Sequence, residues 1–308
     1  MAKRRGKRGR QVDGVLVLDK PQGCTSNEIL QRVKRMYGAD KAGHTGSLDP
    51  LATGVLPLCF GEATKFSQFL LDADKAYVVK AKWGEKTNTG DADGEVVETC
   101  GTEGVSRELL QATLPLFMGD IEQVPSMYSA LKHNGQPLYK LARQGVEVER
   151  QARKIRIHGL ELLDCDAGYF SLNVQCSKGT YIRNLVEDIA EAMGNLAHVV
   201  ELRRTQAGPY RLDQAVTIDS LVAALESGGH AALDRFLQPL GSSVDHWPVL
   251  QLTENTVFYI QNGNPVQVPG APVAGWVKLV GPEQEFIGVG EITDDGKVAP
   301  LRLVSSRS

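Results

Sequence analysis

The sequence is organised around residues 43–58, GHTGSLDPLATGVLPL. Between residues 42 and 61 only Asp49 carries a formal charge, and its neighbours are glycines, prolines, small hydroxyl residues and aliphatic residues. Such a composition is typical of a tight loop that runs into a buried strand. Burying a carboxylate costs several kcal/mol unless other charges or hydrogen bonds compensate. We therefore expect Asp49 to be catalytic or tightly paired; the alternative is an aspartate that caps the turn before Pro50.

The whole-chain composition indicates a globular protein of one large and one smaller domain, or of two domains. Of its 308 residues, 42% are hydrophobic and 23% are charged. No apolar run approaches the roughly 18 residues that span a bilayer, and no secretory signal precedes the first strand, so we expect no membrane and a cytoplasmic location. The five cysteines form no C-x-x-C pair, which indicates reduced thiols and no structural metal site.

Charge is distributed unevenly along the chain. The net charge is −3, but the first ten residues hold six of the 34 Lys and Arg residues and no acid. The remaining 28 basic and 37 acidic residues sum to −9. An acidic body is compatible with a nucleic-acid partner, because phosphate binding depends on local basic stripes. We interpret residues 1–11 as a basic disordered arm that either solubilises the protein or touches RNA.

Strand and helix signals alternate along most of the chain. Residues 12–19, 54–60, 75–83, 155–165, 169–176 and 197–204 read as strands. Capping residues and helical spacing predict helices after Thr25, over 106–117, from about 181 to 193, over 219–226 and over 231–237. Short strands and a helix after residue 248 predict a separate, mostly β module. The fold expected is α+β.

Two further segments point to a polyanionic partner. Residues 126–153 place basic side chains among aromatic and aliphatic ones, a pattern that can follow a phosphate backbone or can simply be a solvated surface. Arg183 lies near the start of a predicted helix, where its charge opposes the helix dipole and therefore suggests a carboxylate or phosphate partner. A lone aspartate can act as a nucleophile, but glycosidases pair it with a second acid, and no second acid lies in this motif.

Four motifs together resemble the TruB family of tRNA pseudouridine-55 synthases, of bacterial type. The resemblance covers about residues 12–245, and the Asp49 loop is its most specific part. Residues after 250 resemble a PUA-like RNA-binding module. The motifs are Lys20-Pro21-x-Gly23-x-Thr25-Ser26, Gly43-His44-x-Gly46-x-Leu48-Asp49-Pro50-x-Ala52-x-Gly54-Val55-Leu56, Lys178-Gly179-Thr180-Tyr181-Ile182-Arg183 and Leu202-Arg203-Arg204-Thr205.

The resemblance implies a pseudouridine-synthase-like fold, a mixed and largely antiparallel sheet with flanking helices. It implies that Asp49 is the nucleophile in an isomerisation that needs no cofactor and no metal. Tyr77 would stack on the target base and handle a proton, and Arg183 would pair with Asp49 and hold it ionised. A base in a folded RNA loop must be flipped out to reach a carboxylate.

The resemblance also assigns substrate-binding roles. Tyr181 and Leu202 would line the uridine pocket, and His44 would contact the extruded nucleotide or occupy the space that it leaves. Lys20 and Pro21 would brace the Asp49 loop.

The partner implied is the T-arm stem-loop of tRNA, bound by a monomer. Residues 12–247 would form the catalytic domain, with residues 126–153 as a mobile RNA-binding thumb, and residues 248–308 the PUA-like module. Two other functions remain possible from the residues alone. A nucleic-acid glycosylase would use the same flipped base but release it by hydrolysis, and an RNA-binding or RNA-folding module would perform no chemistry.

Overall fold

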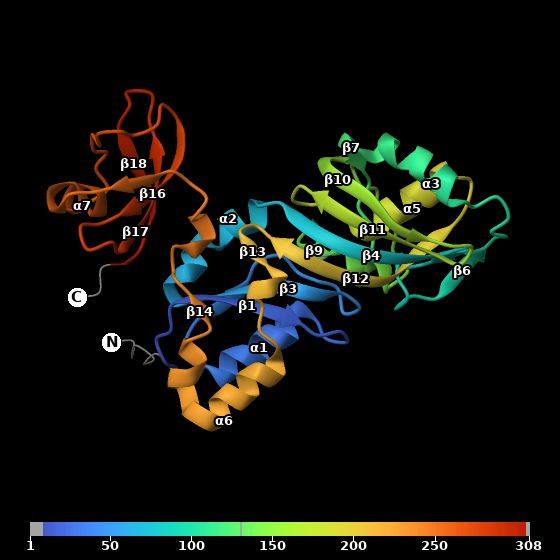
Figure 1. The fold of residues 1–308 in the computed structure, drawn as a ribbon, viewed down its shortest axis with the longest axis horizontal. Coiled ribbons are helices and arrows are strands. Elements are labelled where there is room, and N and C mark those ends of the chain that lie inside the picture. Colours follow the sequence, from blue (N-terminus) through green and yellow to red (C-terminus); the bar gives the residue numbers. More distant parts are fainter. Residues whose placement is uncertain (1–8, 130, 306–308) are drawn as a thin grey trace.

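The computed structural model describes residues 9–129 and 131–305, so the predicted arm up to residue 8 lies outside the described residues. The chain forms a large α+β body and a small β-rich C-terminal module at one end of it (Figure 1). The predicted fold class is therefore confirmed. No helix among the described residues is long and apolar enough to cross a membrane.

The large body is built on one ten-stranded sheet with the order β14-β1-β3-β12-β4-β11-β10-β7; β2 adds to β3 and β13 to β12. Its named ladders are antiparallel except for the parallel contact between β3 and β12. The strands are β1 (Gly14–Lys20), β2 (Ala42–His44), β3 (Thr53–Phe60), β4 (Lys75–Trp83), β7 (Gly119–Gln123), β10 (Arg153–Cys165), β11 (Tyr169–Cys176), β12 (Ala197–Ala207), β13 (Tyr210–Arg211) and β14 (Leu237–Gln238).

Helices cover this sheet and enclose its main hydrophobic core. In Figure 1, α1 and α6 lie together beside β1 and β3, whereas α3 and α5 lie at the other end of the sheet, near β10 and β11. Small strands β5 (Glu85–Thr87) and β6 (Val96–Thr99), and β8 (Lys132–His133) and β9 (Gln136–Pro137), form two separate hairpins. The helices are α1 (Ser26–Met36), α2 (Ser67–Asp72), α3 (Arg107–Thr113), α4 (Leu138–Ala142), α5 (Ile182–Ala192), α6 (Ile218–Asp234) and α7 (Glu254–Gln261).

Local sequence explains the helix that leads into the Asp49 loop. Thr25 and Glu28 form the predicted capping box: the Thr25 side chain accepts from the Glu28 backbone, and the Glu28 side chain accepts from the Thr25 backbone. Ile29, Leu30 and Val33 then bury one face of α1. The two helices expected at 219–226 and 231–237 correspond to the two parts of α6, which are separated by non-helical backbone at Gly229, where φ is +60°.

The parallel contact between β3 and β12 joins the two halves of the sheet directly after the Asp49 loop. Arg203 and Arg204 of β12 pair with Thr53 and Gly54 of β3. A Cβ atom on Gly54 would lie 2.2 Å from the carbonyl oxygen of Arg204, and its φ is +100°. Only glycine allows the strands to approach this closely.

The C-terminal module has its own small core. Its sheet has the order β15-β16-β17-β18, and α7 packs against it. Aromatic side chains connect the module to the large body, with ring centroids 4.9 Å apart for Phe69 and Trp247 and 5.3 Å apart for Trp247 and Trp276. The strands are β15 (Val249–Gln251), β16 (Gly275–Val280), β17 (Phe286–Ile292) and β18 (Val298–Leu303).

Arg10, which we assigned to the disordered arm, is held against the large body. Its guanidinium donates two hydrogen bonds to the Asp234 carboxylate, at 2.7 and 2.6 Å, and a third to the carbonyl of Tyr37. Bidentate pairs of this kind fix both side chains. Arg10 therefore contacts the large body, although it lies within the predicted arm.

Candidate active site

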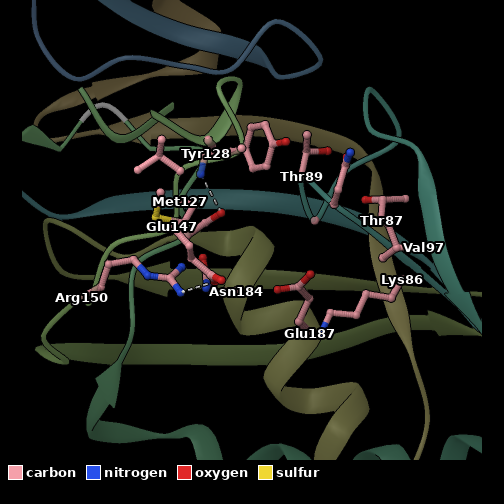
Figure 2. A pocket seen from close by; sticks show the side chains of 16 residues that line it. Lys86, Thr87, Thr89, Val97, Met127, Tyr128, Glu147, Arg150, Asn184 and Glu187 are labelled. Atoms are coloured by element: carbon pink, nitrogen blue, oxygen red, sulfur yellow. Dashed lines mark hydrogen bonds and ion pairs between the residues drawn. The ribbon is translucent and has the colours of Figure 1, made fainter. Parts of the chain in front are cut away.

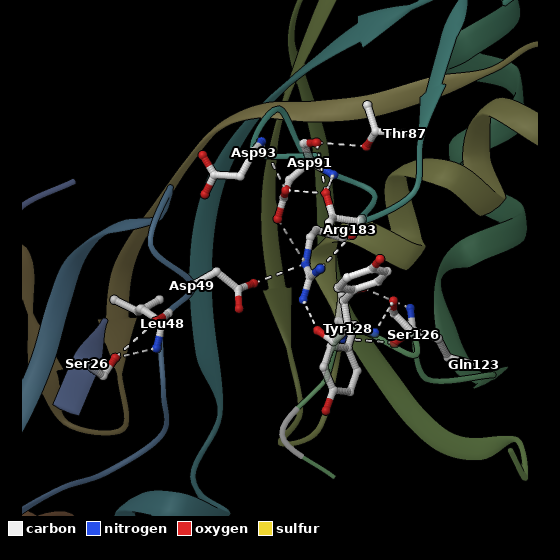
Figure 3. A network of polar contacts seen from close by, with 12 residues as sticks. Ser26, Leu48, Asp49, Thr87, Asp91, Asp93, Gln123, Ser126, Tyr128 and Arg183 are labelled. Carbon is white, nitrogen blue, oxygen red and sulfur yellow. Dashed lines mark hydrogen bonds and ion pairs between the residues drawn. The ribbon is translucent and has the colours of Figure 1, made fainter. Parts of the chain in front are cut away.

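Asp49 lies in the loop between β2 and β3, and the start of α1 holds this loop in place. The Ser26 hydroxyl accepts a hydrogen bond from the backbone N–H of Leu48, at 2.7 Å, and donates to the carbonyl of Leu48, at 3.1 Å (Figure 3). The backbone N–H of Ala52 donates to the carbonyl of Asp49, at 3.1 Å. These bonds fix the backbone on both sides of the aspartate.

Lys20 supports the same loop through hydrogen bonds to backbone carbonyls. It is fully buried, and its ammonium donates to the carbonyls of Ala52, Pro21 and Pro50, at 2.8, 3.0 and 3.4 Å. Burial lowers the pKa of Lys20, and the negative charge of Asp49 partly opposes that shift. The structure thus gives Lys20 contacts suited to the bracing role, whereas the Pro21 side chain is exposed.

Arg183 brings Asp49 together with a second acid. Its Nε atom lies 3.1 Å from Asp49 and 3.6 Å from Asp91, and its two terminal nitrogens donate to the carbonyls of Thr89 and Tyr128, at 2.6 and 2.9 Å (Figure 3). The Arg183 side chain is 6% exposed, so its position is set by these four partners.

Asp49 is less buried than the sequence led us to expect. Its side chain is 43% exposed, whereas those of Arg183 and Asp91 are each 6% exposed. Glycine and aliphatic neighbours do shape a tight loop, but that loop presents the carboxylate at an open surface. Asp49 therefore has one face against a buried cation and another face free for a substrate.

Asp91 is the main site residue that sequence reasoning missed. The Thr89 hydroxyl donates to its carboxylate, at 2.6 Å, and the backbone N–H of Asp93 donates at 3.2 Å. From the sequence we assigned no role to residues 88–94, and we found no second acid within the Asp49 motif. A Thr-x-Asp-x-Asp pattern in a tight loop indicates such local bonds, but nothing in it indicates Arg183 as a partner.

The two predicted tyrosines lie on different elements around this centre. Tyr77 is in β4, is 9% exposed, and has its pKa raised mainly by burial, with Arg204 opposing the shift. Tyr181 directly precedes α5, where the Gln123 side chain bonds both its backbone N–H and its carbonyl, at 2.8 and 3.0 Å. Burial also raises the pKa of Tyr181. The charge of Asp49 acts on both hydroxyls.

His44 and Leu202 complete the set of predicted residues. His44 is in β2, half-buried, and its Nδ1 atom is buried without a hydrogen-bond partner among the described residues. Burial, reinforced by the charge of Arg204, lowers the pKa of His44 and so favours its neutral form. Leu202 is buried in β12 and pairs with Val79 of β4, two residues after Tyr77.

A cavity of about 450 Å³ lies between α5, residues 86–90 and residues 126–150 (Figure 2). Tyr128 and Thr89, whose carbonyls hold Arg183, also line this cavity. Two buried polar atoms, Arg150 Nε and Asn184 Oδ1, have no hydrogen-bond partner among the described residues. Tyr128, within the predicted thumb, therefore supplies one of the carbonyls that hold Arg183.

This geometry can support chemistry by a carboxylate. An exposed oxyanion, oriented by a guanidinium that is itself fixed by buried partners, is suited to attack an electrophilic carbon. Among the described residues no group of three or more His, Cys, Asp or Glu side chains is placed to hold a metal ion. The class that the site suggests is an enzyme that acts through one aspartate.

Comparisons with known proteins agree with this class and make it specific. Residues 34–182 match the family described as TruB family pseudouridylate synthase (N terminal domain). Residues 183–245 match the tRNA pseudouridylate synthase B C-terminal domain, and residues 248–304 match pseudouridine synthase II TruB, C-terminal. The chain belongs to the TruB family of pseudouridylate synthases.

Curated relatives are similar over almost their whole length. The tRNA pseudouridine synthase B of Pseudomonas aeruginosa (strain UCBPP-PA14) is 56% identical over 297 residues, which are 96% of this chain and 97% of the relative. That of Coxiella burnetii (strain RSA 331 / Henzerling II) is 54% identical, over 97% of this chain and 96% of the relative. A chain in the crystal structure of a Cbf5-Nop10-Gar1 complex is 26% identical, with a TM-score of 0.72, over 96% of this chain and 84% of that one.

Proposed function

We propose that this protein converts uridine 55 in the T loop of tRNA to pseudouridine. Its curated relatives are named tRNA pseudouridine synthase B, which supports an isomerase that acts on tRNA. The observation that carries the proposal is the ion pair between Asp49 and Arg183, which leaves one face of the carboxylate open. The names of the relatives state neither which uridine is converted nor that Asp49 takes part in the reaction, so both statements belong to this proposal.

In the proposed reaction Asp49 attacks C1′ of the target nucleotide and uracil leaves with the bonding electrons of the glycosidic bond. The uracil then turns, and its C5 attacks C1′ and displaces the aspartate. Loss of the proton at C5 and gain of a proton at N1 complete an isomerisation with no net change in atoms. Arg183 keeps Asp49 aimed throughout, because its guanidinium pairs with the carboxylate and is itself held by buried partners.

The substrate base must leave its stack before this can occur. Flipping costs a few kcal/mol, and stacking on an aromatic face returns about 1–3 kcal/mol per base. We assign that face to Tyr77, whose hydroxyl also handles a proton. Tyr181 and Leu202 line the uridine pocket, and His44 contacts the extruded nucleotide or occupies the vacated space in the RNA.

The remaining parts of the chain are assigned to RNA binding. Residues 126–153 close over the T arm as a thumb, since they combine basic and aromatic side chains and contact the elements around Arg183. The module after residue 247 supplies a second RNA-binding surface. We propose that the protein acts in the cytoplasm as a monomer, on tRNA and without a metal or cofactor.

One assay separates this function from its two alternatives. The protein is incubated with a T-arm stem-loop RNA carrying labelled uridine, with EDTA and no added cofactor. Carbon-linked pseudouridine in an RNA of unchanged mass supports the proposal. Free uracil would identify a glycosylase, and unchanged uridine with tight RNA binding would identify a binding or folding module.

A further inference from the structure

The start of α5 carries two of the predicted site residues, Tyr181 and Arg183, yet its own sequence does not cap it. Tyr181 is the N-cap residue, and its side chain makes no capping hydrogen bond. The backbone N–H groups at the start of a helix have no partner within the helix, and leaving them unpaired away from water is costly. The geometry of this turn therefore depends on residues from elsewhere in the chain.

Gln123, the last residue of β7, holds this turn with its side chain. Its carboxamide accepts a hydrogen bond from the backbone N–H of Tyr181, at 2.8 Å, and donates one to the Tyr181 carbonyl, at 3.0 Å. One side chain thus pairs with both polar groups of a single residue, as a residue of a neighbouring strand would. Gln123 is 3% exposed, and its backbone pairs with Arg153 of β10, so the sheet fixes the base of this side chain.

Two more hydrogen bonds join the segment after β7 to the first turn of α5. The side-chain amide of Asn184 donates to the carbonyl of Val124, at 2.9 Å. The Nη2 atom of Arg183 donates to the carbonyl of Tyr128, at 2.9 Å (Figure 3). In both bonds α5 supplies the side chain and the other segment supplies the backbone. The Gln123 bonds run the opposite way, because there a side chain fixes the backbone of the helix start.

We propose that Gln123 is a positioning residue for the reaction: by fixing both backbone groups of Tyr181, it sets the direction in which the Tyr181 side chain enters the uridine pocket. The inference rests on the proposed function, which places Tyr181 in that pocket. Without the Gln123 amide the Tyr181 N–H loses its acceptor, and the residue is free to turn relative to α5. A displaced aromatic wall admits the flipped base in unproductive orientations, so the chemical step slows more than binding weakens.

The test is a double-mutant cycle on the whole protein. The variants are Gln123→Met, which keeps the length of the side chain without its amide, Tyr181→Ala, and the double variant. Single-turnover rates, Kd for a T-arm stem-loop and thermal melting are measured for each variant. We expect Q123M to slow the reaction by about 30-fold and to change Kd by less than about threefold. In the Y181A background the same substitution should cost only about twofold, because no aromatic side chain remains to be misplaced.

Two further variants keep the test decisive. Gln123→Glu keeps the accepting oxygen but, as a carboxylate, lacks the N–H donor; it should slow the reaction by about tenfold, and it enters the same cycle if Q123M does not fold. Gln111→Met, at an exposed glutamine of α3, is the matched control and should behave as wild type. Equal losses with and without the Tyr181 side chain, or a weaker Kd at an unchanged rate, would overturn the inference. Failure of the proposed function itself would appear separately, as wild-type protein that forms no pseudouridine.

Discussion

Arg183 approaches Asp49 through its Nε atom, at 3.1 Å, and leaves its two terminal nitrogens to backbone carbonyls. The bond to the aspartate is therefore single rather than forked. Because Nε is the least mobile nitrogen of the guanidinium, this arrangement fixes the direction of Asp49 while one of its faces stays open.

Replacing Asp49 should abolish turnover and spare RNA binding. Asp49→Asn keeps the size of the side chain but removes the nucleophilic charge, so single-turnover formation of pseudouridine should fall by roughly 10,000-fold or more. Kd for the stem-loop should change by less than about threefold, because the proposed phosphate-binding side chains lie in residues 126–153 and not at Asp49. Asp120→Asn, at a side chain that is 73% exposed, is the matched control and should behave as wild type. Near-normal turnover by D49N would contradict the assignment.

Asp91 should affect the rate through Arg183. In Asp91→Asn the amide can keep the Thr89 and Asp93 contacts, but the second charge on Arg183 is lost. A guanidinium held less firmly misaligns Asp49, so we expect the rate to fall by about 10- to 100-fold with folding intact. The exposed neighbour Asp93 supplies the control, Asp93→Asn, compared by single-turnover kinetics and thermal melting. A loss confined to melting temperature would show that Asp91 is only structural.

Lys75 should make stability depend on pH in the alkaline range. Burial lowers the pKa of Lys75 to about 8 from an ordinary 10.5. Between these values the unfolded chain binds more protons than the native protein, so the contribution of Lys75 to stability rises with pH from about 8 to about 10.5. Relative to Lys75→Met, wild type should gain up to about 3 kcal/mol across that window.

The control for this titration is Lys80→Met, at a lysine on the same strand whose side chain is 42% exposed. Its difference from wild type should not vary over the same pH range. Urea unfolding at each pH measures both differences. A wild-type to K75M difference that stays flat from pH 8 to pH 10.5 would show that Lys75 is not desolvated in the native protein.

The thumb should become protected when RNA binds. Trypsin cleavage within residues 126–153 should slow on addition of a T-arm stem-loop at low salt, and about 0.5 M salt should remove the protection because it screens phosphate contacts. Cleavage at Lys297 in the C-terminal module, where the side chain pairs with Asp295, serves as the internal reference. Cleavage of the thumb at the same rate with and without RNA would contradict its assigned role.

Local patterns predicted the regular elements well. Residues 75–83 alternate and form β4 with the predicted bounds, and the capping box at Thr25 starts α1 as expected. The hairpin of β5 and β6 was missed, because Val96–Thr99 is exposed on both faces and so lacks a period of two. Its position depends on packing against the rest of the body rather than on its own sequence.

The sequence predicted mainly those site residues that lie within the recognised motifs. The resemblance named Asp49 and Arg183 as partners, and the structure places them in contact. Asp91 lies more than ninety residues before Arg183 in the sequence. Its contact with Arg183 therefore cannot be predicted from local residue spacing. Arg204 was visible as a motif residue, but only the folded structure shows that its guanidinium donates to the carbonyls of Val55 and Gly46.

Gly54 has a consequence for how this sequence can change. A side chain there would meet the carbonyl of Arg204 at 2.2 Å, and it would have to adopt a φ of +100°. Every substitution must therefore push β3 and β12 apart at their parallel contact and shift the backbone five residues after Asp49. In a saturation library position 54 should tolerate no alternative to glycine, as strictly as position 49 tolerates no alternative to aspartate.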